Sequence, residues 1–333
     1  MTFLNNVEKY RATGQLPPDI AETLHKFYLS YKKAVEKNQG QIESCLPVLN
    51  SFLDYIVDQI KSPFIFPFYH EKITSPFDYY QFGLNFLRPI VDMESSDLIG
   101  LDNVELISSY LDKGENVILL ANHQTEPDPQ AISLLLEKTN PKLAKEIIFV
   151  AGHRVVTDPL TVPFSKGISL LCIYSKNYIE HPPEKKREKV THNQLTMKKM
   201  LKLLSEGGKC IYVAPSGGRD RPNEAGHVEV APFDPQSVEM FWFMARHSSQ
   251  PTYFFPLALA TFNLFPPPES ISVELGEPRL VSCSPVHIGF GSEIDMECFP
   301  GSDEPNKKEC RKARADHIWG LVKDLYSKIS SQG

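Results

Sequence analysis

The chain lacks the features that define several classes of protein. Its 333 residues contain no apolar run near the ~20 residues of a membrane-spanning helix, because Pro, Lys or Gly interrupts the longest runs. The formal net charge of -6 at pH 7 argues against nucleic-acid binding as a general mode. Hydrophobic residues make up 41% and charged residues 23%, the composition of an ordinary globular protein. This length is enough for one large domain and a small one.

Cysteines are few and scattered, and no segment reads as a targeting signal. The six cysteines show no Cys-x-x-Cys spacing, which predicts a reducing compartment and no zinc site. Cys172 and Cys210 lie in apolar runs and are expected to be core thiols. The first residues, MTFLNNVE, have neither the charged-then-apolar pattern of a signal peptide nor the Arg/Ser-rich composition of a transit peptide. We therefore expect a soluble protein.

One stretch places a histidine and an aspartate five positions apart. His123 and Asp128 follow the apolar run 117–121, which reads as a buried strand. Asp128 is followed by Pro129 and the apolar segment 130–138, a pattern that predicts an N-cap, a Pro at the first helical position and a helix. Loops at the ends of buried strands commonly carry the chemistry of α/β proteins. A carboxylate can fix the tautomer of a histidine and stabilise its protonated form.

A purely structural alternative exists for both residues. An aspartate before a proline is commonly only a helix cap, and a histidine at a strand end is commonly a solvated loop residue. Five positions do not fall on one face of a helix. His123 and Asp128 can therefore meet only if the loop between them folds back, and Pro127 in that loop stiffens it.

A second strand-like run, 210–214, opens into a loop of a different kind. Gly217 and Gly218 allow positive φ and close approach of backbone N–H groups to a ligand. Arg219 and Arg221 suit bidentate recognition of phosphate or carboxylate oxygens. The alternative is a surface turn whose arginines are solvated or pair with the aspartate between them.

These two segments together resemble a known family. Residues 122–128 resemble the first block of the glycerolipid acyltransferases, whose signature is His, four residues, Asp. Residues 215–222 resemble the third block of the soluble plastid-type glycerol-3-phosphate 1-O-acyltransferases. The blocks occur in the family's order, with 151–154 between them and 255–260 after them. The resemblance runs over almost the whole chain, including the helical N-terminal segment.

The resemblance implies a reaction and a role for each matched residue. His123 would be the general base that deprotonates the sn-1 hydroxyl of glycerol 3-phosphate, and Asp128 would orient it. The alkoxide would attack the thioester of an acyl carrier protein or acyl-CoA, giving lysophosphatidic acid in the first step of phospholipid synthesis. Arg219 and Arg221 would bind the acceptor's phosphate. Neither a metal nor a cofactor is implied, and backbone N–H groups near the glycines or after Asp128 are candidate oxyanion donors.

The segment after the run 170–174 departs from the family pattern. Plant members carry a Lys-His pair there, whereas the matching pair here is Asn177-Tyr178, preceded by Lys176. The phosphate is therefore expected to bind Lys176 with Arg219 and Arg221, with Asn177 and Tyr178 as neutral donors. Alternatively, the phosphate site is weaker or differently shaped. Further candidate contacts are Ser216, Gly217 and Gly218, and also His153 and Arg154, although a loop His-Arg pair is more commonly polar surface.

The family also suggests partners and a location. An acidic carrier protein would need a local basic patch, for which 185–189 and 198–199 are candidates, although a solvated helix face is the commoner reading of such runs. We expect a monomer without a transmembrane segment, which contacts a membrane transiently to deliver its product and does not bind nucleic acid. The expected location is the bacterial cytoplasm or the plastid stroma.

The hydrophobic pattern predicts an α/β protein with a small helical bundle before its sheet. Residues 1–75 are assigned to the bundle, with helices at 19–29 and at 46–60, where Pro47 would lie in the first turn. Residues 76–333 are assigned to a larger α/β domain with a mixed, mostly parallel sheet flanked by helices. Its strands are predicted at 117–121, 147–151, 170–174, 210–214, 253–260 and 271–275, and its helices at 130–138, 193–205, 235–247 and 308–330.

Two other functions compete with acyl transfer. The first is a serine hydrolase or thioesterase that uses Ser216 with His123 and Asp128, although the sequence around Ser216 is not the G-x-S-x-G elbow. The second is a non-catalytic module that binds a phosphorylated metabolite through Arg219 and Arg221. Substitution of Ser216 and of His123 by alanine separates the three functions, because each depends on a different set of these residues.

Overall fold

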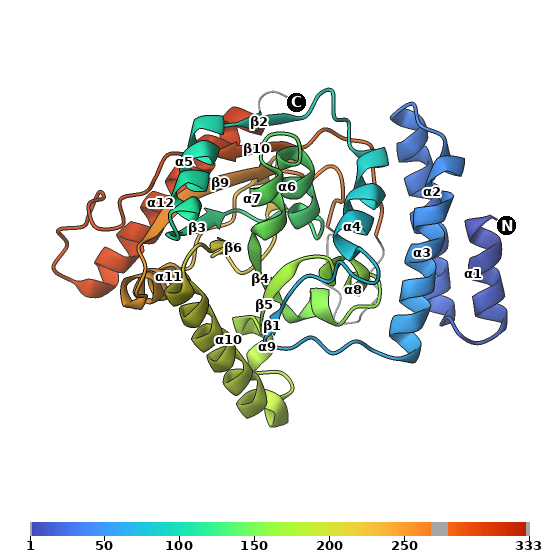
Figure 1. Ribbon diagram of the computed structural model, residues 1–333, viewed down its shortest axis with the longest axis horizontal. Helices are drawn as coiled ribbons and strands as arrows, with labels where there is room; N and C mark the ends of the chain where they lie inside the picture. The colour runs from blue at the N-terminus through green and yellow to red at the C-terminus, as the bar shows by residue number, and fades with distance from the viewer. Residues whose placement is uncertain (1, 268–278, 331–333) are drawn as a thin grey trace.

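Three helices at the N-terminus form the predicted bundle. The computed structural model describes residues 2–267 and 279–330, and of Lys176 and Asn177 only the backbone. The helices are α1 (Phe3–Ala12), α2 (Pro18–Lys37) and α3 (Ile42–Lys61), which stand side by side at the right of Figure 1. The two predicted helices are confirmed in longer form. The placement of Pro47 is wrong, because α3 begins at Ile42 and Pro47 lies inside it.

Aromatic side chains join this bundle to the rest of the molecule. Phe27 and Tyr31 of α2 are buried one turn apart and contact Phe86 of α4 (Tyr79–Leu87), with ring centroids 5.8 and 5.3 Å away. The Tyr31 hydroxyl donates to the Phe86 carbonyl at 2.7 Å. A short strand, β1 (Tyr69–His70), already pairs with the large sheet. Bundle and sheet therefore share one continuous core, and the division of the chain at residue 75 stays a prediction.

The large sheet is mixed and mostly parallel, as predicted. Its order is β1-β5-β4-β6-β3-β9-β10-β2, and the five strands from β5 to β9 in this order are parallel to one another. The predicted strand 271–275 lies outside the described residues. The strands are β2 (Asp97–Ile99), β3 (Asn116–Ala121), β4 (Ile148–Gly152), β5 (Ser169–Ile173), β6 (Cys210–Val213), β9 (Thr252–Ala260) and β10 (His287–Phe290).

Helices cover both faces of the sheet, because alternate residues of a buried strand point to opposite sides. Val117 and Leu119 of β3 pack with α4, α5 (Leu101–Asp112), α6 (Asp128–Leu136) and α7 (Pro141–Glu146). Ile118 and Leu120 pack with α10 (Lys186–Glu206), α11 (Pro235–His247) and α12 (Lys307–Ser330). The predicted helices 130–138, 193–205, 235–247 and 308–330 are thus confirmed. Shorter elements are α8 (Val162–Ser165), α9 (Lys176–Ile179), β7 (Arg221–Pro222), β8 (Val228–Glu229), η1 (Arg88–Ile90), η2 (His153–Val156) and η3 (Pro183–Lys185).

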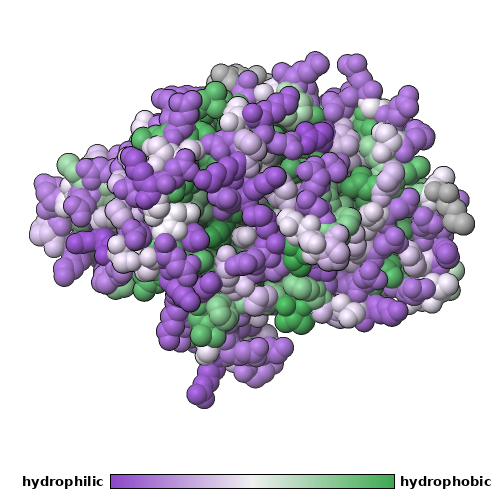
Figure 2. Space-filling view, viewed as in Figure 1, coloured by the Kyte–Doolittle hydropathy of each residue, from purple (hydrophilic) through white to green (hydrophobic). Residues whose placement is uncertain are grey.

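The surface and the sheet topology together indicate where a site can form. Hydrophilic residues cover most of the face drawn in Figure 2. Within the described ranges, no helix has the length and apolar character needed to cross a bilayer. Because the central strands are parallel, the loops after β3, β4, β5, β6 and β9 all leave from the same edge of the sheet. The residues singled out from the sequence lie in these loops.

Candidate active site

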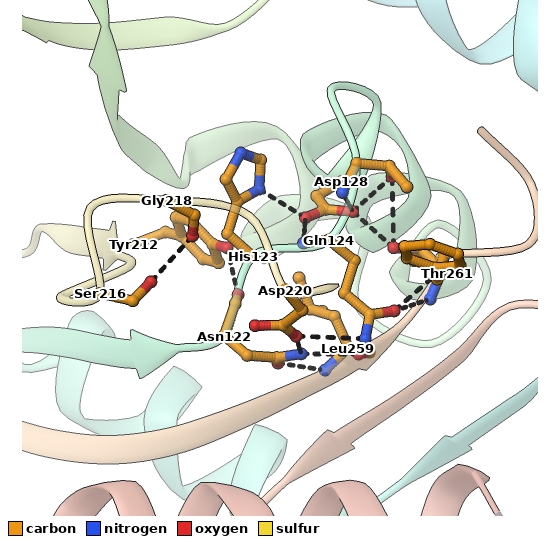
Figure 3. Close-up of polar contacts among 12 residues, drawn as sticks. Asn122, His123, Gln124, Asp128, Tyr212, Ser216, Gly218, Asp220, Leu259 and Thr261 are labelled. Carbon is orange, nitrogen blue, oxygen red and sulfur yellow. Dashed lines mark hydrogen bonds and ion pairs between the residues drawn. The ribbon is translucent and has the colours of Figure 1, made fainter. Parts of the chain in front are cut away.

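The loop after β3 folds back and brings His123 against Asp128. The Nδ1 atom of His123 lies 2.8 Å from Oδ2 of Asp128 (Figure 3). The same oxygen accepts the backbone N–H of Gln124 at 2.8 Å. A turn in which the Asp128 N–H donates to the Thr125 carbonyl at 3.2 Å closes the loop. The predicted meeting of the two side chains is therefore present.

Asp128 is buried, and both of its carboxylate oxygens accept hydrogen bonds. It is 1% exposed, and its Oδ1 accepts the backbone N–H of Thr125 at 3.1 Å and the hydroxyls of Thr125 and Thr261 at 2.7 and 2.6 Å. Burial by itself would raise the pKa of Asp128. The hydrogen bond and charge of His123, with the two threonine hydroxyls, outweigh it and hold the pKa below its ordinary value. The carboxylate is therefore ionised at neutral pH.

The prediction that Asp128 caps the following helix is wrong. Helix α6 begins at Asp128 itself, with Pro127 at the N-cap position and Pro129 one residue inside. The Asp128 carboxylate points back to the N–H groups of Gln124 and Thr125, which precede the helix. Its side chain thus orders the loop of His123 instead of capping the helix.

An ionised Asp128 determines the tautomer of a neutral His123. A carboxylate only accepts hydrogen bonds, so Nδ1 of His123 carries the proton in this pair and Nε2 carries the lone pair. The His123 side chain is 32% exposed, whereas that of Asp128 is 1% exposed. A proton acceptor at the surface, backed by a buried anion, can take a proton from a bound hydroxyl group.

Asp220 ties the arginine loop to the loop of His123. Its backbone N–H donates to the His123 carbonyl at 2.7 Å, and its Oδ2 accepts from Asn122 Nδ2 at 2.7 Å and Gln124 Nε2 at 3.2 Å. Its Oδ1 accepts the backbone N–H of Ala231 at 2.9 Å. Burial is the main cause that raises the pKa of Asp220. These bonds place the residues on either side of Asp220, Arg219 and Arg221, beside the histidine loop.

The strand end at β9 completes the support of this loop. Asn122 exchanges two hydrogen bonds with the backbone of Leu259, at 2.7 and 2.9 Å. Gln124 Oε1 accepts the N–H groups of Thr261 and Phe262 at 2.7 and 2.9 Å. Three loops that are far apart in the sequence therefore meet at one buried polar network (Figure 3). Asn122, Gln124 and Thr261 were not among the site residues expected from the sequence. Asn122 and Gln124 lie in the block 122–128 that carried the resemblance, whereas the only signal of Thr261 is a polar residue at the end of an apolar strand.

We expect Thr261→Val to destabilise the protein in a pH-dependent way. The change removes a hydroxyl that donates to Asp128 at 2.6 Å, which should cost about 2 kcal/mol of unfolding free energy at pH 7. The folded-state pKa of Asp128 is lowered, so its contribution exists above the unfolded value of about 3.9 and is lost as the pH falls through the folded pKa. The difference between variant and wild type should therefore stay constant from pH 7 to about pH 4 and shrink below it, as measured by urea unfolding from about pH 7 to about pH 2.

The matched control for this prediction is Thr196→Val. Thr196 is also fully buried, but its hydroxyl donates to the Cys172 carbonyl at 2.7 Å, and a carbonyl does not titrate. Its cost should stay constant below about pH 4, the range in which the cost of Thr261→Val shrinks. The same pH profile in both variants would contradict the assigned role of Thr261.

The hydroxyl of the glycine-loop serine is engaged within its own loop. Ser216 Oγ donates to the Gly218 carbonyl at 2.9 Å (Figure 3). Gly217 has the positive φ, 67°, that the paired glycines predict, and its N–H donates to the Ala214 carbonyl at 3.2 Å. The structure thus brings His123 and Asp128 together but does not join Ser216 to them.

The ends of β4 and β5 place further predicted residues along the same edge. The rings of His153 and Tyr174 lie 4.4 Å apart. Burial is the main cause that lowers the pKa of His153, and the nearby ammonium of Lys189 lowers it further. Tyr178 lies in α9 and is 37% exposed. The side chains of Lys176 and Asn177 lie outside the described part of the structure, so their expected contacts stay predictions.

An ion-pair cluster that sequence reasoning missed lies beside the histidine loop. Arg279 donates from Nε and Nη2 to Glu126 at 2.7 and 3.0 Å, and from Nη2 to Asp158 at 2.9 Å. Burial would raise the pKa of Glu126, but Arg279 first, and then Arg219 and Arg154, hold it below its ordinary value. No signal in the sequence connects residue 279 with residue 126. Among the residues that the structure describes, no group of three or more His, Cys, Asp or Glu side chains is arranged to hold a metal ion.

Comparisons with known proteins identify the class and then the family. The model of the family described as Acyltransferase matches residues 103–260, which contain the His123 and Arg219 loops. The chain is 39% identical to the chloroplastic glycerol-3-phosphate acyltransferase ATS12 of Cucurbita moschata, over 99% of this chain and 72% of that one. It is 37% identical to the chloroplastic enzyme of Pisum sativum (98% and 72%) and 35% identical to that of Arabidopsis thaliana (99% and 72%). The chain therefore belongs to the family of chloroplastic glycerol-3-phosphate acyltransferases, which confirms the predicted resemblance.

Proposed function

We propose that the protein transfers a fatty acyl group from a thioester to the sn-1 hydroxyl of glycerol 3-phosphate. Relatives at 35–39% identity that are named for acyl transfer to this acceptor support the proposal. The observation that carries it is the contact of 2.8 Å between His123 and the buried Asp128. An exposed imidazole nitrogen backed by a buried carboxylate is the arrangement that general-base catalysis on a hydroxyl needs.

The chemistry proceeds in two proton transfers around one carbonyl carbon. Nε2 of His123 takes the proton of the sn-1 hydroxyl while that oxygen attacks the thioester carbonyl, and the resulting imidazolium is stabilised by the Asp128 carboxylate. The tetrahedral intermediate then collapses, the C–S bond breaks, and the thiolate takes the proton back from His123. The products are lysophosphatidic acid and a free thiol, and no acyl group is attached to the enzyme.

The acceptor is held through its phosphate. Arg219 and Arg221 are the proposed ligands, with Lys176 as a third cation and Asn177 and Tyr178 as neutral donors. The bonds of Asp220 to the histidine loop support this proposal, because they keep the arginine loop next to the base. A phosphate bound there fixes the distance of the sn-1 hydroxyl from His123 and makes the attack effectively unimolecular.

The acyl donor is proposed only as a class, an acyl thioester, and the cellular location is proposed from the relatives. Acyl carrier protein and acyl-CoA both present the same thioester. The exposed basic residues within 185–188 and the pair 198–199 would favour the acidic carrier protein. Lys189 does not belong to this surface, because it is buried and its ammonium donates to the Tyr178 carbonyl at 2.7 Å. The chloroplastic relatives support a location in the plastid stroma. A monomer that contacts membranes only to deliver its product remains our expectation.

Release of thiol from an acyl thioester tests the proposal directly. Purified protein is given oleoyl-CoA or oleoyl-acyl carrier protein, with and without glycerol 3-phosphate, and free thiol is measured. We expect release to require glycerol 3-phosphate, because the acceptor hydroxyl is the nucleophile. Release that ignores the acceptor would indicate a thioesterase, and no release from either donor would refute the proposal.

Ser216→Ala separates acyl transfer from serine hydrolysis in the same assay. We expect the rate to fall by less than about tenfold, because Ser216 Oγ donates to the Gly218 carbonyl and supplies at most a substrate contact. A nucleophilic serine would instead cost on the order of 10³-fold or more. A loss of that size, together with acceptor-independent release, would favour the hydrolase.

A further inference from the structure

Arg279 connects two loops that belong to different strand ends. Its guanidinium forms a two-bond contact with Glu126, three residues after His123, at 2.7 and 3.0 Å. A third bond, at 2.9 Å, reaches Asp158 in the segment that follows η2. The side chains of Arg279, Glu126 and Asp158 are 11%, 21% and 1% exposed. Two carboxylates at the edge of the site therefore share one largely buried arginine, which offsets one of their two negative charges.

Two other arginines, Arg154 and Arg219, lie next to this cluster, as backbone hydrogen bonds of their segments show. The Arg154 carbonyl accepts the N–H of Asp158 at 2.9 Å, so Arg154 belongs to the same turn as a carboxylate that Arg279 binds. Arg219 precedes Asp220, whose N–H donates to the His123 carbonyl at 2.7 Å. The charges of Arg219 and Arg154 both act on the carboxyl group of Glu126. Glu126 thus lies among three arginines beside the proposed base.

We propose that Arg279 is a positioning residue of the acceptor site, which binds Glu126 so that its negative charge does not compete with the acceptor's phosphate for Arg219 and Arg154. This inference rests on the proposed function, because it assigns Arg219 to that phosphate. Arg279 itself need not touch the substrate. It suits the task because its planar fork holds one carboxylate by two bonds and has a further N–H for a second one.

Loss of Arg279 would make the proposed phosphate site more negative. Glu126 would keep its negative charge without its main partner and would turn to Arg219 and Arg154, the other cations that act on it. A dianionic phosphate would then have to displace a carboxylate already inside the protein. The effect would fall on acceptor binding, because the contact of His123 with Asp128 does not involve Arg279.

Steady-state kinetics of Arg279→Gln provide the test. We expect the KM for glycerol 3-phosphate to rise on the order of tenfold, with kcat within about threefold of wild type. The double variant Glu126→Gln/Arg279→Gln removes the competing charge, and its KM should return to within about threefold of wild type. Both variants leave Asp158 without its bond to Arg279, so a loss of stability is common to them and cannot explain the difference in KM.

The matched control is Arg314→Gln. Arg314 is 12% exposed, pairs with Glu239 and donates to the Met296 carbonyl at 3.1 Å, on the α11–α12 side of the molecule. It should lose stability without a change in KM. An Arg279→Gln KM within twofold of wild type, a double variant as weak as the single one, or an equal rise in KM in the control would each overturn the proposal.

Glu126→Gln alone keeps the proposal testable if Arg279→Gln fails to fold. It leaves Arg279 bound to Asp158 and removes one negative charge near the proposed phosphate site, so calorimetry should show glycerol 3-phosphate binding about threefold tighter than in wild type. Weaker binding would overturn the proposal.

The same calorimetry separates this proposal from the proposed function. A wild-type protein that binds glycerol 3-phosphate or inorganic phosphate but does not use the former as acceptor would refute acyl transfer. The order of phosphate affinities among the variants would still decide the role of Arg279. A wild-type protein that binds neither ligand would overturn both proposals.

Discussion

Replacement of His123 by alanine is expected to lower kcat for acyl transfer by about 10³-fold. The change removes the proposed proton acceptor, while the ring it deletes is one third exposed and contributes little to the core. The KM for glycerol 3-phosphate should stay within a few-fold of wild type, because the proposed phosphate ligands lie in the other loop. The measurement is acceptor-dependent thiol release at saturating donor, with acceptor affinity determined separately by calorimetry.

A second histidine controls for the general effect of this substitution. His247 on α11 also holds its ring by an Nδ1 contact, 2.7 Å from the Phe243 carbonyl, but it lies on an exposed helix end. His247→Ala should keep wild-type activity. His123→Ala with more than about a tenth of the wild-type rate would refute the role of the base. If wild type and His123→Ala both bind glycerol 3-phosphate and neither releases thiol, the chain is a binding module.

The strands and helices that frame the site were predictable, because local sequence determines them. The runs 117–121, 210–214 and 253–260 are continuous apolar stretches bounded by polar residues, and a central parallel strand with helices on both faces demands that pattern. The predicted site residues lie in the loops that follow the first two of these runs, 117–121 and 210–214. The structure adds edge strands that are too short for such a pattern, β1 with two residues and β2 with three.

The contacts that hold the site together were not predictable from local pattern. Asn122 and Leu259 are 137 positions apart, and Glu126 and Arg279 are 153 apart. A polar residue at a strand end gives no indication of which distant backbone group it will bind. The cap predicted for Asp128 failed for the same reason: local sequence suggested a helix start, whereas the carboxylate satisfies the loop before it and a threonine from β9's end.

Asp220→Ala is expected to cause the largest combined loss of stability and activity. The change removes the acceptor for Asn122, Gln124 and the Ala231 N–H in a site that is 0% exposed. Each buried donor left without an acceptor costs about 1–3 kcal/mol, and part of this is offset because a buried carboxylate is removed. We expect a net loss of about 3 kcal/mol in urea unfolding. We also expect kcat/KM to fall on the order of 10²-fold, because the arginine loop is no longer fixed beside His123.

Two further variants test whether this loss arises from the link between the loops. Asp220→Asn keeps one oxygen for the two amide donors but presents an NH₂ group to Ala231, so its stability and activity should fall between those of wild type and Asp220→Ala. Asp234→Ala makes the same substitution farther along the same connection, where the carboxylate caps α11 by accepting the N–H of Ser237 at 2.9 Å. It should cost about 1 kcal/mol and leave kcat/KM unchanged. Equal effects of Asp234→Ala and Asp220→Ala on kcat/KM would mean that the site responds to any loosening of this segment. A loss confined to residue 220 would mean that its bonds to Asn122 and Gln124 hold the proposed phosphate ligands at the base.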